Sequence, residues 1–301
     1  MADEPIATPE GGAQAAPPGA DRTGGGGPES RAVHPRELLR IREDVPGWLR
    51  WALGVVPIAV LLGVWWLLTG SGPAEGRIIS SVILPSPLEV LHSFPKLWFD
   101  RALTRNAGLS LSRVLAGFAI GVAVAFPLGL LMGAFSKIKA MFNPLAVFGA
   151  YLPIPALVPL TMSLLGTGEG QKMGFLALAF VVYLLPLIVT AVDNVDDVYL
   201  KTAFTLGANT SQVVRKVLLA ISWPDIYQAL RMGFGIGWSY IILAELVGLD
   251  GLGGIIMVSQ RQGPREHIYL VLLVIVLIAF VTDKLWQLVG QVLFPYRERR
   301  R

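Results

Sequence analysis

The chain has 301 residues, of which 53% are hydrophobic and 15% are charged, with a net charge of +4. Soluble domains carry about 25% charged residues, so this composition disfavours a cytosolic globular enzyme and favours a protein that crosses a membrane several times. The absence of cysteine excludes disulfides, thiolate metal sites, iron–sulfur clusters and cysteine nucleophiles. Histidine occurs only at three scattered positions, so we expect neither a metal nor a cofactor (His34, His92 and His267).

Residues 1–45 form the first expected segment, a disordered stretch on the cytoplasmic side. They are rich in Gly, Pro, Ala and Glu, include four consecutive glycines at 24–27, and lack the apolar periodicity that a core requires. They do not resemble a signal peptide, because an apolar region followed by a cleavage site is missing. Basic residues precede the first apolar run, which places the N-terminus inside.

Residues 46–296 form the expected transmembrane domain. A helix needs about 20 apolar residues to cross a bilayer, and we find six candidates, at about 51–69, 112–134, 144–166, 173–192, 226–248 and 267–288. The third is interrupted by prolines, which predicts a broken or re-entrant segment, and region 70–105 is expected to form short interfacial helices. The sequence therefore predicts an all-α, polytopic membrane protein with about six transmembrane helices.

Lysine and arginine positions set the expected orientation. They gather before the first span, between the second and third, between the fourth and fifth, and after Lys284. The arginine-rich end, 297–301, is expected to be a basic cytoplasmic tail. Both termini are therefore predicted to be cytoplasmic. The net positive charge is explained by the basic residues that orient the chain in the membrane, so we expect no nucleic-acid binding.

Residues 193–225 form the expected inner loop, which is long for a simple connection. Either Asp196 or Asp197 can cap a first short helix. Gly207 follows its last turn, where a residue with positive φ is usual. Asn209 can open a second helix through a capping box. The loop therefore predicts a helix–glycine turn–helix unit.

The second helix of this unit is expected to be amphipathic. Val213, Val217 and Ile221 recur four residues apart, and Val214 and Leu218 lie alongside them, with Arg215 and Lys216 flanking this apolar stripe. One interpretation is a connector that lies on the lipid surface. The other is a docking element that fits a groove of a soluble partner.

Five stretches carry a family resemblance when they are taken in order. The loop contains Lys-Thr-Ala-Phe-Thr-Leu-Gly at 201–207 and, nine residues later, Val-Leu-Leu-Ala at 217–220. The other four stretches lie at 84–90, 110–114, 153–160, and 244–246 with 251–253. Together they resemble the inner-membrane permeases of ABC importers, in the nitrate, sulfonate, taurine and bicarbonate branch. The resemblance covers about residues 50–295.

The resemblance implies a type I permease fold with a coupling loop that inserts into a groove of an ATP-binding cassette ATPase. It also implies an extracytoplasmic solute-binding protein and a homodimer, or a pair with a related permease. The family motif has Glu at position 201 and Pro at position 220, where this chain has Lys201 and Ala220. Lys201 therefore places a positive charge at the implied ATPase contact, where the family motif has a negative one. The residues implied to contact the ATPase are Lys201, Ala203, Phe204, Leu206, Gly207 and Ala208.

The proline-rich third segment supplies candidates for the translocation path. Irregular backbone is tolerated at membrane depth only against protein or a water-filled cavity. We therefore expect the path near this segment, with a packing kink as the alternative. The candidate path or gate residues are Pro153, Pro155, Pro159, Thr161, Ser163 and Glu245.

Few ionisable residues fall within the spans, and we expect the helix bundle to bury no charge. Glu245 is interpreted either as a gate or docking contact or as one partner of a helix-end ion pair. Asp283, beside Lys284, is interpreted as a helix-end contact. Arg113 is interpreted as a snorkelling anchor or as a group that faces an anion pathway.

Pairs of glycines four residues apart predict close helix packing. They occur at 117 and 121, at 129 and 133, and at 233 and 237. A nucleotide-binding loop is missing, because the string at 166–173 has the wrong spacing and no Ser or Thr after its lysine. ATP would therefore have to be bound by another chain.

The sequence thus predicts the membrane subunit of an ATP-driven importer for a small anion or sulfonate-like solute, located in a bacterial inner membrane and itself not an enzyme. The alternative is a secondary transporter or channel that ATP does not drive, although the carboxylates that proton or sodium coupling needs are scarce in the spans. A membrane-embedded enzyme would need a cluster of catalytic groups at one depth, and the sequence offers none.

Overall fold

The computed structural model describes residues 45–70, 79–81, 83–246 and 248–296. Residues 1–56 and 57–301 form two separate units, and the candidate site lies in the second. The predicted disordered segment, apart from Val45, and the predicted basic tail lie outside the described residues. The described part of the chain contains helices and turns and no strand.

The helices fall into a long and a short class. The long ones are α1 (Gly47–Thr69), α4 (Leu103–Ala134), α5 (Ser136–Ala150), α7 (Glu169–Asp193), α10 (Leu219–Glu245), α11 (Gly251–Gln262) and α12 (Glu266–Leu293). The short ones are α2 (Pro87–His92), α3 (Phe94–Asp100), the 3-10 helix η3 (Ile154–Leu157), α6 (Val158–Leu165), α8 (Asp197–Thr205), α9 (Thr210–Gln212) and the π-helix η4 (Val213–Leu218).

Four helices within the described residues, α1, α4, α7 and α12, are long and apolar enough to cross a membrane. A fifth candidate is α5 together with η3 and α6, which are bent by 95° at the break between them. The predicted fifth segment corresponds to α10, but this helix does not reach the same hydropathy, since it contains glycines and the charged residues Arg231 and Glu245. The predicted count of six spans is therefore not confirmed.

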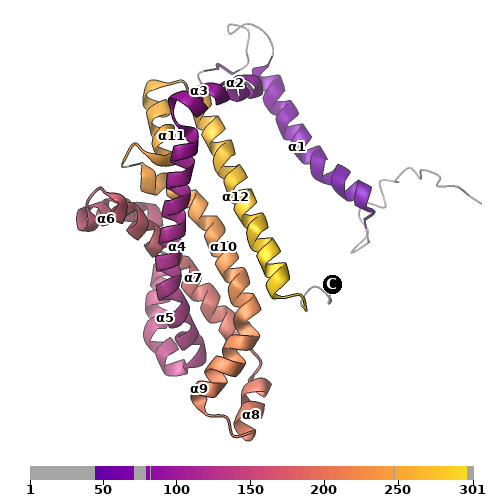
Figure 1. Ribbon diagram of the computed structural model, residues 1–301, viewed down its shortest axis with the longest axis vertical. Helices are drawn as coiled ribbons and strands as arrows, with labels where there is room; N and C mark the ends of the chain where they lie inside the picture. The colour runs from indigo at the N-terminus through magenta and orange to yellow at the C-terminus, as the bar shows by residue number, and fades with distance from the viewer. Residues whose placement is uncertain (1–44, 71–78, 82, 247, 297–301) are drawn as a thin grey trace, which may run out of the picture. The chain divides into compact units, whose positions relative to one another are not determined.

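Helix α7 is the central helix of the 57–301 unit. It packs against α4 on one side and α10 on the other (Figure 1). In its most apolar stretch 61% of residues are buried, compared with 17% in α12. Its fully buried side chains include Phe175, Leu184 and Ile188. The core of this unit is therefore built around α7, while α12 presents most of its apolar surface outward.

Glycines allow α4 to approach α7 closely. A Cβ atom on Gly117 would lie 2.6 Å from the Cβ of Leu176, and one on Gly121 would lie 2.6 Å from the Cβ of Phe180. About three turns further along α4, Gly133 faces Val192 in the same way. Such separations leave no room for a side chain, so the predicted role of the glycine pairs in close helix packing is confirmed.

The third predicted segment breaks as expected. Helix α5 ends at Ala150, and Pro153 stands at the N-cap of η3. Pro155 and Pro159 occupy the first turns of η3 and α6. A proline is tolerated in the first turn because its missing N–H would have no helical acceptor there. The prolines therefore start new short helices and do not merely kink one long helix.

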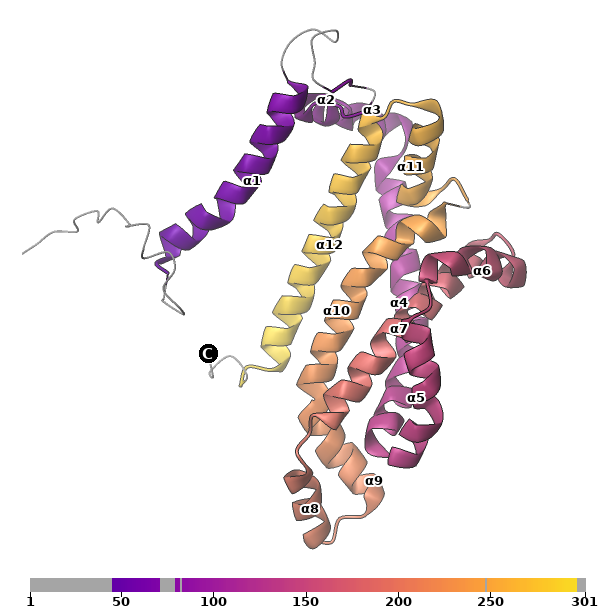
Figure 2. The same ribbon diagram turned by 180° about the vertical axis from the view of Figure 1, so that it is seen from behind.

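Short helices were predicted in region 70–105, and its described part contains α2 and α3. Helix α2 begins with a capping box, in which Ser86 and Glu89 each accept a hydrogen bond from the other's backbone N–H. Both helices pack against α12. Figure 2 shows α2 and α3 near the end of α12 that joins α11, and α8 and α9 at the opposite end of the bundle.

Candidate functional site

The helix–glycine turn–helix unit forms from its predicted local signals. Asp196 is the N-cap of α8, and its side chain accepts a hydrogen bond of 2.9 Å from the backbone N–H of Val198. Gly207 has φ of +83°. Asn209 and Gln212 form a reciprocal capping box with two bonds of 2.9 Å. The predicted caps and the glycine turn are therefore confirmed.

The predicted apolar stripe of the second helix is confirmed only in part. Residues 213–218 form the π-helix η4, which has more residues in a turn than an α-helix. Val213 and Leu218, five residues apart, are therefore the buried pair, with exposed fractions of 2% and 4%. Val217 is only half-buried, and Ile221 is exposed.

The six residues implied to contact an ATPase lie at the tip formed by α8 and the following turn. Ala203 is buried, because α8 packs against η4, and Ala208 is half-buried. The other four are exposed, namely Lys201, Phe204, Leu206 and Gly207. Val198 and Tyr199 of α8 are also exposed. The tip therefore presents four large apolar side chains, Val198, Tyr199, Phe204 and Leu206, which we call the α8 apolar tip.

The predicted path and gate residues do not form one cluster. Thr161 is buried, donates to the carbonyl of Val158 and accepts a bond of 3.2 Å from the side chain of Gln171. It thereby ties α6 to α7. The three prolines and Ser163 are exposed, namely Pro153, Pro155, Pro159 and Ser163. Glu245 lies elsewhere, fully buried at the end of α10.

A cluster of charged residues surrounds Arg113 of α4. The Arg113 side chain is only 1% exposed. Its guanidinium bonds Glu245 of α10 at 2.8 Å, Glu169 of α7 at 2.5 Å and 2.7 Å, and Asp250 of the α10–α11 turn at 2.8 Å. Lys172 of α7 is 3% exposed and bonds Glu169 at 3.1 Å and Asp250 at 2.6 Å. These five residues are called the Arg113 cluster below.

The Arg113 cluster contradicts two expectations. The bundle does bury charge, and Arg113 is neither a snorkelling anchor nor free to face an anion pathway, because three carboxylates surround it. The helix-end ion pair expected for Glu245 is present. Sequence reasoning missed Glu169, Lys172 and Asp250, which lie outside or at the ends of the apolar runs. The available signal was that an arginine within a span needs an opposite charge.

Glu245 also holds the first turn of α11. Its Oε2 accepts a bond of 2.8 Å from the backbone N–H of Gly253, and Ser110 accepts one of 2.9 Å from Leu252. Asn106 accepts one of 2.9 Å from Gly251. Three backbone donors that a helix start leaves without helical partners are thus satisfied by α4 and α10. Glu245 of the Arg113 cluster therefore acts together with Asn106 and Ser110 to hold α11 against the bundle.

Asp250 lies in the turn between α10 and α11. Partial burial raises the pKa of its carboxyl, but hydrogen bonds from Lys172 and Arg113 outweigh this effect and hold the pKa below its usual value. The carboxyl is therefore ionised at neutral pH and complements the two cations.

A second ion pair joins α10 to α12. Arg231 donates to the two carboxylate oxygens of Asp283 at 2.6 Å and 2.9 Å. Lys284 instead bonds Gln287, at 3.1 Å. The ion pair expected for Asp283 is therefore present, but its expected place at a helix end is wrong, because Asp283 lies inside α12 and its partner lies inside α10.

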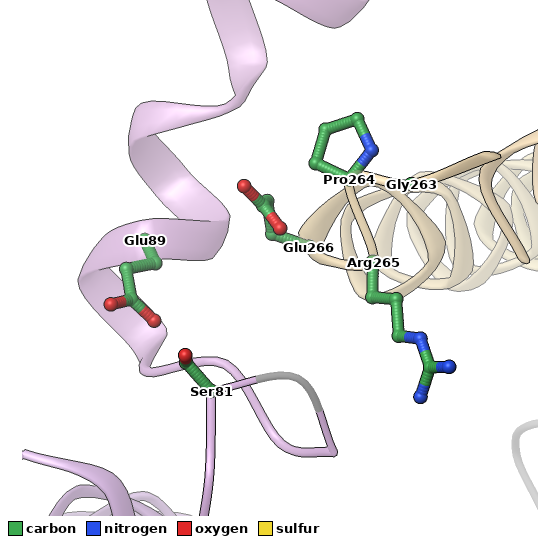
Figure 3. Close-up of a pocket in the computed structure, with 6 residues that line it drawn as sticks. All are labelled: Ser81, Glu89, Gly263, Pro264, Arg265 and Glu266. Carbon is green, nitrogen blue, oxygen red and sulfur yellow. The ribbon is translucent and has the colours of Figure 1, made fainter. Parts of the chain in front are cut away.

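A pocket of about 400 Å³ lies between the segment before α2 and the turn that joins α11 to α12 (Figure 3). Its lining residues are Ser81, Glu89, Gly263, Pro264, Arg265 and Glu266. It contains none of the predicted site residues, and its lining carries two carboxylates, Glu89 and Glu266, and one guanidinium, Arg265.

Comparisons with known proteins agree on one family. Residues 125–293 match the family described as the binding-protein-dependent transport system inner membrane component. A probable ABC transporter permease protein of Brucella abortus is 31% identical, with 82% of this chain and 96% of the relative covered. The taurine transport system permease protein of Escherichia coli is 30% identical, with 77% and 84% covered. The bicarbonate transport system permease protein of Synechococcus elongatus is 26% identical, with 83% and 91% covered.

Solved structures show the same fold. An inward-facing structure of the MetNI methionine ABC transporter has a chain that matches with a TM-score of 0.59 at 19% identity, over 66% of this chain and 97% of that chain. A chain of an amino acid ABC transporter crystallised with histidines matches with a TM-score of 0.55 at 16% identity, over 69% and 98%. The predicted all-α permease fold is thereby confirmed. The chain belongs to the family of binding-protein-dependent transport system inner membrane components, the membrane-embedded transport subunits of ABC importers.

Proposed function

We propose that this chain forms the translocation path of an ATP-driven importer for a small anion or sulfonate-like solute, and that it couples to a separate ATPase through residues 193–225. The family membership supports an importer permease. The names of relatives that transport taurine, aliphatic sulfonates and bicarbonate support the solute class. A solute-binding protein delivers the solute on the opposite side of the membrane.

The α8 apolar tip is the observation that carries the coupling proposal. At 100° per residue, Val198, Tyr199 and Phe204 point in directions that span well over half of the helix circumference. A helix lying on lipid keeps its apolar side chains on one face. A protein groove, by contrast, encloses a helix on several sides, and this arrangement favours the docking interpretation.

The charge of the loop gives the proposed ATPase contact a distinctive requirement. Lys201 is exposed on α8, next to the apolar tip. Where the family motif has a glutamate, this chain therefore presents a cation. We propose that the matching ATPase groove carries an acidic residue at this contact, because an unmatched charge at a buried interface is costly.

The orientation and assembly follow from the same proposal. The ATPase binds in the cytoplasm, so the α8 apolar tip and both chain termini lie on the cytoplasmic side, and the Arg113 cluster lies near the outer side. The exposed prolines of the third segment face a second permease subunit, an identical copy or a related chain, and the path runs between the two subunits.

Reconstitution tests this function. The permease is purified with its ATPase, placed in lipid vesicles and supplied with the binding protein. Accumulation of radiolabelled taurine, methanesulfonate or bicarbonate is then measured with and without ATP. The proposal predicts accumulation of at least one of these solutes that requires ATP. Accumulation driven by a proton or sodium gradient without ATP would instead support the alternative, a secondary transporter.

A further inference from the structure

The buried cations of the bundle are already neutralised. Arg113 and Lys172 are the two buried lysine or arginine residues in the part of the chain that the structure describes, and Arg231 is half-buried within α10; each of the three bonds at least one carboxylate. The side-chain exposures are 1%, 3% and 22%. Among the described residues, an anionic solute that passes between the helices therefore meets no buried lysine or arginine that lacks a counter-charge. Neutral hydrogen-bond donors can bind its oxygens there without a counter-charge of their own.

Two tyrosines provide such donors. The hydroxyl groups of Tyr183 in α7 and Tyr240 in α10 lie 3.0 Å apart, and either can donate to the other. Their ring centroids are 6.0 Å apart. Two phenols carry two O–H hydrogens, and the bond between them uses one. The second hydrogen has no acceptor among the described residues, and Tyr183 is 36% exposed.

The position of Tyr183 is unusual for a tyrosine that faces lipid. It stands 14 residues after the start of α7 at Glu169, which corresponds to about 20 Å along the helix. Tyrosines of membrane proteins gather at the water interfaces, where the hydroxyl remains hydrated. An exposed hydroxyl in hydrocarbon loses those hydrogen bonds at a considerable cost. A hydrated path satisfies the same group.

The proline-broken segment lies beside this position. A Cβ atom on Gly149, at the end of α5, would lie 3.7 Å from a methyl group of Val182, the neighbour of Tyr183. The break between α5 and η3 begins two residues later, at Tyr151. On the α10 side, Ser239 precedes Tyr240 and is exposed. Irregular backbone and neutral hydroxyl groups therefore occur together next to the tyrosine pair.

We propose that the Tyr183–Tyr240 pair binds the oxyanion group of the solute, a sulfonate or carboxylate-type group, as it passes through the permease. This inference rests on the proposed function and names the donors within it. A phenol donates a strong hydrogen bond to a charged oxygen. It carries no charge of its own, so the solute is bound and also released, as passage requires.

Water access to the pair is tested first by thiol labelling. The chain contains no cysteine, so Tyr183→Cys introduces a single target. The control is Val276→Cys on α12, where the valine is 64% exposed. A charged methanethiosulfonate reagent is added to membranes that contain the assembled transporter. We expect labelling of Tyr183→Cys at least tenfold faster than that of Val276→Cys, and slower labelling when methanesulfonate, taurine or bicarbonate is present in excess.

Equal and slow labelling of the two variants would overturn the inference, because position 183 would then face lipid or a second subunit. Rapid labelling that none of the three anions slows would also count against it. Neither result depends on transport activity.

Removal of the hydroxyl groups is the second test. Tyr183→Phe and Tyr240→Phe keep the rings, and Tyr296→Phe, beyond the end of α12, is the matched control. A hydrogen bond to a charged group contributes about 1.5–3 kcal/mol. We therefore expect anion uptake by each of the first two variants to fall about tenfold or more, with ATP hydrolysis and the melting temperature unchanged.

The outcomes separate the two proposals. If the unmodified protein accumulates one of the anions and both phenylalanine variants do so at the same rate, the tyrosine inference fails and the proposed function stands. If uptake falls only in step with a lower melting temperature, the pair is a structural link between α7 and α10 and the inference fails. If the unmodified protein accumulates none of the three anions, the proposed function fails, and anion protection in the labelling experiment decides the inference.

Discussion

Arg113 and Glu245, 132 residues apart in the sequence, form an ion pair of 2.8 Å in which both side chains are buried. The pair links α4 to the end of α10, and Glu245 in turn holds the first turn of α11. Removal of one partner from a buried pair leaves an uncompensated charge, which costs about 3–5 kcal/mol. The position of α11 therefore depends on a charge that comes from a distant helix.

Loss of Arg113 is predicted to destabilise the protein more than loss of Glu245 does. Arg113→Gln leaves Glu245 fully buried with no cation, whereas Glu245→Gln leaves Arg113 with Glu169 and Asp250. We expect Arg113→Gln to lower the melting temperature in detergent by clearly more than Glu245→Gln does. The double variant should recover part of the loss. Equal losses in the two single variants would contradict the proposed charge balance.

Gly251 is predicted not to tolerate a side chain, because of its positive φ and its close approach to Glu245. Its φ is +79°, and a Cβ atom there would collide with the Glu245 carboxylate. Gly166 has φ of +78° and open space around it, so it serves as a control for backbone strain alone. We expect Gly166→Ala to cost about 1–2 kcal/mol and Gly251→Ala to cost several kcal/mol more, measured by thermal unfolding. Similar losses would show that the close approach to Glu245 is unimportant.

Because the pKa of Asp250 is lowered in the folded protein, we predict that stability depends on pH. Its pKa lies below the ordinary value of 3.8 because Lys172 and Arg113 donate hydrogen bonds to it. A lowered folded-state pKa gives stability that is present above the unfolded-state pKa and is lost as the pH falls through the folded-state pKa. The difference in melting temperature between the unmodified protein and Asp250→Asn should therefore be constant from pH 7 to about pH 5 and shrink below about pH 4. A constant difference down to pH 3 would contradict this assignment.

Lys201 is predicted to select the ATPase partner. Lys201→Glu restores the charge of the family motif, and it should weaken capture of this protein's own ATPase about tenfold if the groove is acidic. Lys216→Glu, an exposed change in η4, is the control for net charge. Pull-down from detergent-solubilised membranes at low salt measures the effect. Unchanged capture of the ATPase by the Lys201→Glu variant would show that the charge at position 201 does not affect binding to the ATPase groove.

The sequence predicted best those features that local rules determine. The caps at Asp196 and Asn209 and the positive φ of Gly207 depend on residues within one or two turns. The glycine pairs of α4 were predictable because four-residue spacing places them on one helix face.

Features that depend on distant contacts were missed. The carboxylates around Arg113 come from α7, α10 and a turn, and their approach is set by how the helices cross. The π-helix at 213–218 was not predicted, and it makes Val213 and Leu218, five residues apart, the buried pair, since a 3.6-residue period does not apply there. The hydroxyl contact between Tyr183 and Tyr240 likewise joins residues 57 positions apart.

ATP-driven uptake by two Gly207 variants tests whether the loop at 193–225 couples the permease to its ATPase. Gly207 has φ of +83° and open space where a side chain would begin, so Gly207→Ala and Gly207→Trp share the backbone strain and differ in bulk at the proposed ATPase contact. The account predicts that Gly207→Trp inserts into the membrane normally but loses ATP-driven anion uptake, while Gly207→Ala keeps most of it. Normal uptake by a correctly folded Gly207→Trp variant would contradict the proposal that this loop couples the permease to its ATPase.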